Sequence, residues 1–121
     1  MTSTGPGFEL QPRDSITVVR FCDARLLAAD RITGLDRDVS AWLSAHPGAK
    51  VVLDLSVVKA VSSDFLAKLI GWRTLVQKCQ GRLKLVGLGS SLQELFDVTR
   101  LSKKFEIEPD LETAAARLAD S

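Results

Sequence analysis

The sequence predicts an α/β fold in which a mixed β-sheet of four or five strands is flanked by about four α-helices. β-branched runs alternate with stretches whose apolar residues recur at helical spacing, the order typical of strands joined by helical crossovers. A hairpin precedes the first helical stretch and adds an antiparallel pair to an otherwise parallel sheet. With 121 residues, 45% of them hydrophobic, the chain fits one globular domain over residues 8–119, preceded by a disordered lead-in over residues 1–7.

The first half of the predicted domain contains a hairpin, a helix and a buried strand. Residues 16–21 (ITVVRF) alternate between two faces, and residues 8–10 are expected to pair with them. Between about residues 30 and 46 apolar side chains recur at helical spacing, and Pro47-Gly48 ends this helix. Residues 50–55 (KVVLDL) are apolar at nearly every position, which indicates a central strand covered on both faces.

The second half repeats the alternation of helix and strand. An apolar stripe from Phe65 to Val76 predicts a helix that ends near Gly81. Residues 91–94 (SLQE) fit a capping box, in which Ser and Glu side chains bond reciprocally to the backbone at a helix start. The remaining expected elements are a strand at 83–88, a third helix through Leu95 and Phe96, a short strand at 105–107 and a terminal helix bearing Leu111, Ala115 and Leu118.

The composition argues against several classes of function. The chain has sixteen Lys and Arg residues and fifteen Asp and Glu residues, and the resulting net charge of +1 does not indicate nucleic acid or an anionic membrane as a partner. No apolar run approaches the roughly 20 residues of a spanning helix, so we expect a soluble, cytoplasmic protein. Cys22 and Cys79 lack a CxxC or Cys/His pattern, which favours reduced thiols over metal ligands.

No convergent set of catalytic residues is visible either. His46, the single histidine, stands at a predicted helix end, where a cation is favoured without catalysis. The chain has no P-loop motif, and Gly87-Leu88-Gly89 lacks the third glycine of a dinucleotide-binding turn. We therefore expect no enzymatic activity, no metal and no cofactor.

The segment 61–66 (VSSDFL) places two hydroxyls between a buried strand and an apolar helix. A serine at such a position commonly caps the helix, since its oxygen accepts a bond from an unpaired backbone N–H. The same geometry suits a phosphate, because the helix N-terminus is positive and its backbone donors are open. Spacing alone favours the cap and leaves the phosphate as the alternative.

Three stretches together resemble the STAS domain of bacterial anti-sigma-factor antagonists. They are VVLDLSVVKAVSSDFLAKLIGW, GRLKLVGLGSSLQELFDVTRLSKKFEI and the Ala-rich final helix, and the match is best over residues 50–118. The resemblance implies a STAS-type sandwich and a cycle of partner exchange. In that cycle the unphosphorylated antagonist binds an anti-sigma factor that is also a serine kinase carrying its own ATP. Phosphorylation releases the antagonist, and a serine phosphatase resets it.

The resemblance also implies a phosphoacceptor. The family motif is Asp-Ser-Ser-Gly-Leu, and setting Leu66 on its leucine places Ser63 on the phosphorylated serine. This sequence departs from the motif, with Ser62 for Asp, Asp64 for the second Ser and Phe65 for Gly. Ala28 also stands where the family often has an acidic residue.

The expected partner surface surrounds Ser63, because a kinase must reach it. Its candidate contacts are Lys59, Ser62, Asp64 and Lys68, although Lys68 also has the i,i+4 spacing for an ion pair with Asp64, which we favour. The rival hypothesis is a STAS adaptor without a switch, a subunit of a signalling scaffold or of a transporter complex.

Two further groups of residues are predicted to be structural. Arg100, Lys103 and Lys104 are expected to form a solvated surface rather than a partner contact. Trp42 and Trp72 fit helix faces and are expected to pack, with an exposed anchor as the alternative for Trp72.

Overall fold

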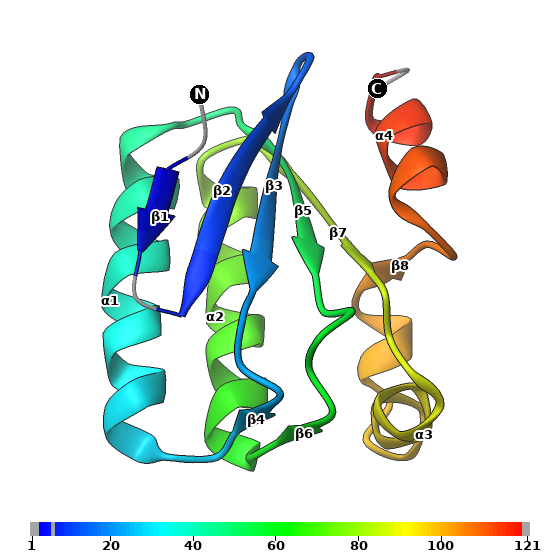
Figure 1. Ribbon diagram of the computed structural model, residues 1–121. Helices are drawn as coiled ribbons and strands as arrows, with labels where there is room; N and C mark the ends of the chain where they lie inside the picture. The colour runs from blue at the N-terminus through cyan, green and yellow to red at the C-terminus, as the bar shows by residue number, and fades with distance from the viewer. Residues whose placement is uncertain (1–2, 6, 120–121) are drawn as a thin grey trace.

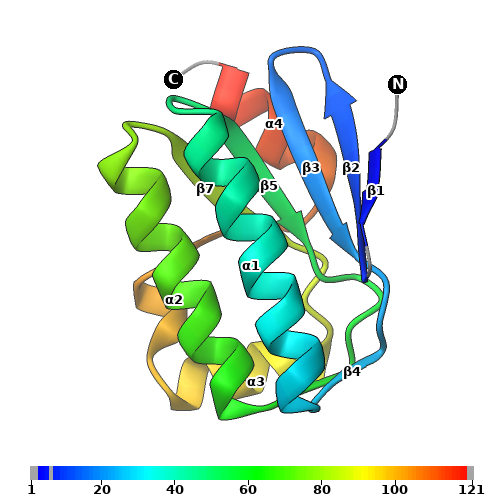
Figure 2. The ribbon, with the colours of Figure 1, turned by 90° about the vertical axis from the view of Figure 1, so that its left-hand side faces the viewer.

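The computed structural model describes residues 3–5 and 7–119, which are arranged in layers around a central sheet. Helices α1 (Ala29–Ala45) and α2 (Ser63–Lys78) lie side by side on one face of the sheet, and α4 (Leu111–Ala119) lies on the other (Figure 1, Figure 2). Helix α3 (Ser90–Val98) lies at the end of the molecule where α1 and α2 begin. The predicted α/β sandwich with four helices is confirmed.

The central sheet is mixed, with strand order β1-β2-β3-β5-β7-β8. The first three strands pair antiparallel, and β3, β5, β7 and β8 pair parallel, as expected for a hairpin followed by helical crossovers. A separate parallel pair joins β4 (Arg25–Leu26) to β6 (Ala60–Val61). The strands of the central sheet are β1 (Ser3–Gly5), β2 (Phe8–Arg13), β3 (Ile16–Phe21), β5 (Lys50–Asp54), β7 (Arg82–Val86) and β8 (Glu106–Ile107).

The N-terminal lead-in differs from the expectation of disorder over residues 1–7. Ser3–Gly5 form β1 and pair with Phe8–Leu10 at the edge of the sheet, so the sheet has one strand more than expected. The outer edge of β2 has unpaired backbone groups, and a short extended segment can satisfy them without a hydrophobic pattern of its own. Residues 1, 2 and 6 lie outside the described part of the chain.

The capping box predicted at residues 91–94 is wrong. Helix α3 begins at Ser90 with Gly89 as its N-cap, and no side chain caps it. Because the helix starts two residues earlier than the capping box implies, Ser91 lies inside the first turn and not at the cap. The terminal helix has the side-chain cap instead, since Asp110 Oδ1 accepts the backbone N–H of Thr113 at 2.8 Å.

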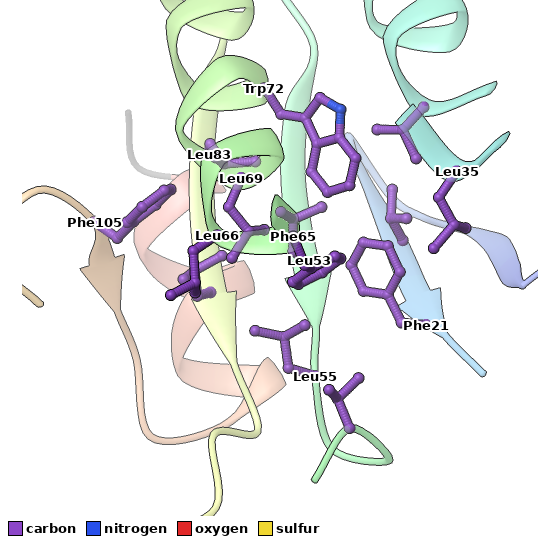
Figure 3. Close-up of a cluster of buried hydrophobic side chains, with 14 of the residues drawn as sticks. Phe21, Leu35, Leu53, Leu55, Phe65, Leu66, Leu69, Trp72, Leu83 and Phe105 are labelled. Atoms are coloured by element: carbon purple, nitrogen blue, oxygen red, sulfur yellow. The ribbon is translucent and has the colours of Figure 1, made fainter. Parts of the chain in front are cut away.

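The main core lies between the sheet and the pair α1 and α2, and Figure 3 shows part of it. Three aromatic rings fill its centre: Phe21 stacks on Trp72 with ring centroids 5.8 Å apart, and Phe65 meets both edge-on at 5.6 and 5.8 Å. Burial of Trp72 confirms its packing role. Strand β5 is central as predicted, because Val51 and Leu53 face this core and Val52 faces the smaller cluster beneath α4.

An ion cluster joins β7, β8 and α4 on the second face. Lys84 of β7 is buried, and its Nζ donates to Glu106 and, at 2.9 Å, to Glu108. Arg117 of α4 lies 3.5 Å from the other oxygen of Glu108. Burial alone would lower the pKa of Lys84, but its hydrogen bonds to both glutamates and their negative charges outweigh burial, and the pKa is raised. Lys84 therefore keeps its charge although it is buried.

Candidate functional site

Ser62 and Ser63 lie where the chain passes from β6 into α2. Ser62 has an extended backbone and is the N-cap of α2, and its Oγ accepts the backbone N–H of Phe65 at 3.2 Å. Its own N–H donates to the carbonyl of Leu26 at 3.0 Å. Ser62 is therefore half-buried and held at both its backbone and its side chain, which is the structural role that the spacing indicates.

Ser63 is the first residue of α2 and is exposed. Within the described residues its hydroxyl has no hydrogen-bond partner. The neighbouring Ser62 already supplies the helix cap, so the Ser63 hydroxyl oxygen can be reached by another molecule from solvent. A phosphate attached there would lie at the positive end of a helix 16 residues long, where negative charge is stabilised.

The segment before α2 is anchored to the segment before α1. Backbone N–H groups of Lys59 and Ala60 both donate to the carbonyl of Ala24, at 2.7 and 3.1 Å. The pairing of β4 with β6 continues this ladder to Leu26 and Val61. The starts of α1 and α2 are thus joined by backbone bonds at one end of the molecule (Figure 1), which fixes the position of Ser63.

Gly87 lets the loop after β7 lie close to the loop after β5. Gly87 follows β7 with φ +79°, and a Cβ built there would lie 2.8 Å from the backbone nitrogen of Ser56 and 3.0 Å from Asp54 Oδ1. That carboxylate accepts the N–H of Ser56 at 2.9 Å. Positive φ and close backbone approach both require glycine here. The chain after β5 is therefore packed against the chain after β7.

The expected partner contacts occupy different positions at this end. Asp64 is exposed beside Ser63. Lys59 is also exposed, and it lines a shallow pocket of about 140 Å³ with Gly89, Ser90 and Ser91 at the start of α3. The α3 residues were not identified from the sequence, because only the fold brings the two loops together.

Lys68 forms a contact other than the one favoured from spacing. Its Nζ lies 3.8 Å from Asp36 of α1, and the described residues show no ion pair between Lys68 and Asp64. Asp36 also accepts a hydrogen bond from Trp72 Nε1 at 2.9 Å. Lys68 therefore helps to join α1 to α2, since Asp36 is an interhelical acceptor that i,i+4 spacing does not predict.

Two apolar residues near Ser63, Phe65 and Leu27, differ in their exposure to solvent. Phe65, which replaces the motif glycine, is only 1% exposed and points into the core, so it does not crowd the surface at Ser63 (Figure 3). Leu27 is 42% exposed and follows Leu26, whose carbonyl binds Ser62. The sequence pattern gave no signal for an exposed leucine near the two serines, and one such residue is common on protein surfaces.

Other chemistry has little support in residues 3–5 and 7–119. This part of the chain holds no group of His, Cys, Asp or Glu side chains arranged for a metal ion. Cys22 and Cys79 are free thiols. Among the helices described, none is long and apolar enough to cross a membrane.

A family model and solved structures of other proteins agree on the fold of this chain. The family model described as "Mlab, STAS domain" matches residues 25–111. No curated protein sequence matches the chain. An anti-sigma-factor antagonist (STAS) domain protein from Planctomyces limnophilus superposes with a TM-score of 0.84 at 19% identity, covering 93% of this chain and 97% of that chain.

Two other proteins with this fold come from different kinds of system. The anti-sigma factor antagonist SpoIIAA, from Bacillus, is solved in unphosphorylated and phosphorylated forms. The unphosphorylated form has a TM-score of 0.77 at 14% identity and covers 94% of this chain and 97% of that chain. The murine anion transporter Slc26a9 has a TM-score of 0.75 at 16% identity, covering 92% of this chain but 19% of the transporter. At these identities the likeness shows the fold alone.

Proposed function

The chain belongs to the STAS domain family, and from this membership we propose that it is a cytoplasmic anti-sigma-factor antagonist controlled by phosphorylation of Ser63. Its partner is a kinase-type anti-sigma factor, which brings the ATP, and a serine phosphatase reverses the modification. The chain itself performs no turnover. Its contact surface comprises Ser63 and the side chains of Lys59, Ser62, Asp64 and Lys68.

The observation that carries this proposal is the difference between two adjacent serines. Ser62 is engaged as the helix cap, whereas Ser63 is exposed and its hydroxyl is free of partners in the described part of the chain. A kinase can modify Ser63 without breaking the cap that starts α2. The modified protein therefore keeps its fold, as a reversible switch requires.

The physical effect of the phosphate is local. It adds a charge of about −1.5 to −2 beside Asp64 and close to the exposed Leu27, on a surface that must lose water when a partner docks. Desolvating a dianion without a compensating cation is costly. Phosphorylation thus weakens docking at this end while leaving the buried aromatic cluster untouched. SpoIIAA, whose fold this chain shares, exists in both states.

A binding experiment with charge-matched variants tests the proposal. The purified chain is mixed with a purified histidine-kinase-like ATPase encoded in the same genome, and affinity is measured by calorimetry. Ser63→Glu is expected to bind about tenfold more weakly or worse than the wild type, because it mimics part of the phosphate charge. Ser44→Glu adds the same charge to an exposed position in the last turn of α1 and is expected to bind like the wild type.

A second function from another class has one specific observation in its favour. The match to Slc26a9 covers almost all of this chain but a fifth or less of the transporter, so a STAS fold also occurs as one part of a transport protein. A STAS adaptor of a transporter complex or signalling scaffold has no need of a switch. In that case Ser63→Glu and Ser44→Glu bind the partner equally well, and this result rejects the switch.

A further inference from the structure

A second surface feature lies at the opposite end of α2 from Ser63. Three elements enclose a pocket of about 90 Å³ there: the last turns of α2, the start of β7, and the chain that joins η1 (Leu101–Lys103) to β8. Its polar lining includes three cations, Arg73, Arg82 and Lys104, and a single carboxylate, Glu106. The pocket therefore holds an excess of positive charge in a chain whose net charge is only +1.

The one carboxylate does not balance these cations. Glu106 accepts hydrogen bonds from Arg82 Nη2, at 3.3 and 3.4 Å, and from the buried Lys84, which does not line the pocket. It is thus already shared between two positive groups. Arg73 and Lys104 form no ion pair or hydrogen bond through their side chains within the described residues. These two positive charges have no counter-charge among the described residues.

The walls of the pocket are fixed by backbone contacts and buried side chains. Val76, Leu83 and Phe105 line it and are each at most 9% exposed. A Cβ at Gly81 would lie 2.4 Å from the carbonyl of Ala49, so this turn is tightly packed. The carbonyls of Val76 and Gln77 each accept one N–H group, from Gly81 and Gln80, but they lie at the negative end of α2, so the attraction for an anion comes from the cations alone.

From this arrangement we propose that the pocket binds a phosphate-type oxyanion between Arg73, Lys104 and Arg82. A dianion matches the two uncompensated cations, and guanidinium and ammonium groups bind phosphate through charge-assisted hydrogen bonds. The volume is sufficient for a small anion, since about 90 Å³ is several times the roughly 10–15 Å³ that one water molecule needs by the same measure. The site lies at the end of α2 away from Ser63 and does not depend on the proposed switch.

Titration of the isotope-labelled full chain tests this site by NMR. Inorganic phosphate and free O-phosphoserine are added separately, with sodium chloride at equal ionic strength as the control for screening. Saturable shifts are expected at the amides of Gly81, Arg82 and Phe105 and at the Arg73 side-chain N–H. Tighter binding of O-phosphoserine indicates a phosphoryl group carried on a larger molecule, whereas equal or tighter binding of phosphate indicates the free ion.

Three variants connect the shifts to the cations. Arg73→Gln and Lys104→Gln are each expected to weaken binding about tenfold, the value of one charge-assisted bond. Arg13→Gln removes an exposed cation from β2, which lies toward the opposite edge of the sheet from β7 and β8, and is expected to leave the affinity unchanged. Folding of each variant is checked by its amide spectrum.

Three results would overturn the site. The first is the absence of saturable shifts up to about 50 mM phosphate, which is well above the Kd of about 1 mM of a weak specific site. The second is shifts that sodium chloride reproduces, and the third is shifts that persist in the Arg73→Gln, Lys104→Gln double variant.

Discussion

Ser62 and Ser63 carry the same hydroxyl one residue apart, and the fold uses them differently. Ser62 Oγ is bonded to the N–H of Phe65, whereas the side chain of Ser63 is exposed and unbonded within the described residues. The two interpretations of this segment, a helix cap and a phosphoacceptor, therefore need not compete, because each can belong to a different serine.

This division predicts different stabilities for two alanine variants. Ser62→Ala is expected to lower the free energy of unfolding by about 1 kcal/mol, because α2 loses its N-cap. Ser63→Ala is expected to stay within about 0.5 kcal/mol of the wild type, as for an exposed residue without partners. Urea denaturation of both variants measures the difference. Equal losses, or a larger loss for Ser63→Ala, would contradict the assignment of the cap.

Phe65 is the residue at which departure from the family motif affects the core. It meets Phe21 and Trp72 edge-on and is almost fully buried. Phe65→Ala is expected to lower the free energy of unfolding by about 3–5 kcal/mol, through lost burial and the cavity left behind. Chemical denaturation followed by circular dichroism measures this loss. A loss below about 1 kcal/mol would mean that the site collapses or that the ring contributes little.

At the scale of elements, the pairing of α1 with α2 depends on a polar contact within an apolar interface. Asp36 of α1 accepts the indole N–H of Trp72 at 2.9 Å and the hydroxyl of Ser40 at 3.0 Å, and it lies 3.8 Å from Lys68. A buried indole donor without an acceptor is costly, so this one carboxylate fixes how the two helices face each other.

Removing that acceptor is expected to have a measurable cost. Asp36→Ala leaves the Trp72 N–H unsatisfied and is expected to lower the free energy of unfolding by about 1–3 kcal/mol. Asp38→Ala, in the same helix, removes a carboxylate whose ion pair with Arg37 is exposed, and is expected to cost less than about 0.5 kcal/mol. If the two variants unfold alike, Asp36 does not hold the interface.

The elements themselves were largely predictable from the sequence, and their contacts were not. The periodicity of residues 30–46 and the β-branched run at 50–55 correspond to α1 and β5. The bond between Asp36 and Trp72 spans 36 residues, and local spacing contains no information about it. The capping box prediction failed because the helix begins two residues earlier, with Gly89 as its N-cap, and local spacing did not exclude that start.

The candidate site was also predictable only in part. The sequence singles out Ser62 and Ser63 because both stand at a strand–helix junction. It misses Leu27 and the start of α3, because only the β4–β6 ladder and the close approach at Gly87 bring those segments to the junction. A short edge strand such as β1 is equally invisible, as its partner supplies all the pairing that it needs.

At the scale of the whole molecule, charge is distributed unevenly although its sum is close to zero. The second face of the sheet contains the buried Lys84 with Glu106 and Glu108, and α4 adds Arg117. This cluster joins the last strand and the last helix to the sheet. The hydrogen bond from Lys84 lowers the pKa of Glu106 below its usual value.

That shift predicts how stability depends on pH. Because the folded-state pKa of Glu106 is below the unfolded value of about 4.3, its contribution is present above that value and is lost as pH falls through the folded pKa. Between about pH 6 and pH 3 the wild type is expected to lose stability more steeply than Glu106→Gln. Glu94→Gln, at an exposed position of α3, is expected to follow the wild type. Parallel curves for wild type and Glu106→Gln would contradict a role for this carboxylate.

The switch assigned to Ser63 is tested most directly by mass spectrometry. Intact mass and phosphopeptide mapping are carried out on protein purified from its native cells, in active growth and under stress, with a Ser63→Ala strain as the control. We expect one phosphate, mapped to Ser63 and absent from the control. An unmodified Ser63 in every sample would contradict the switch and leave the chain as a constitutive STAS adaptor.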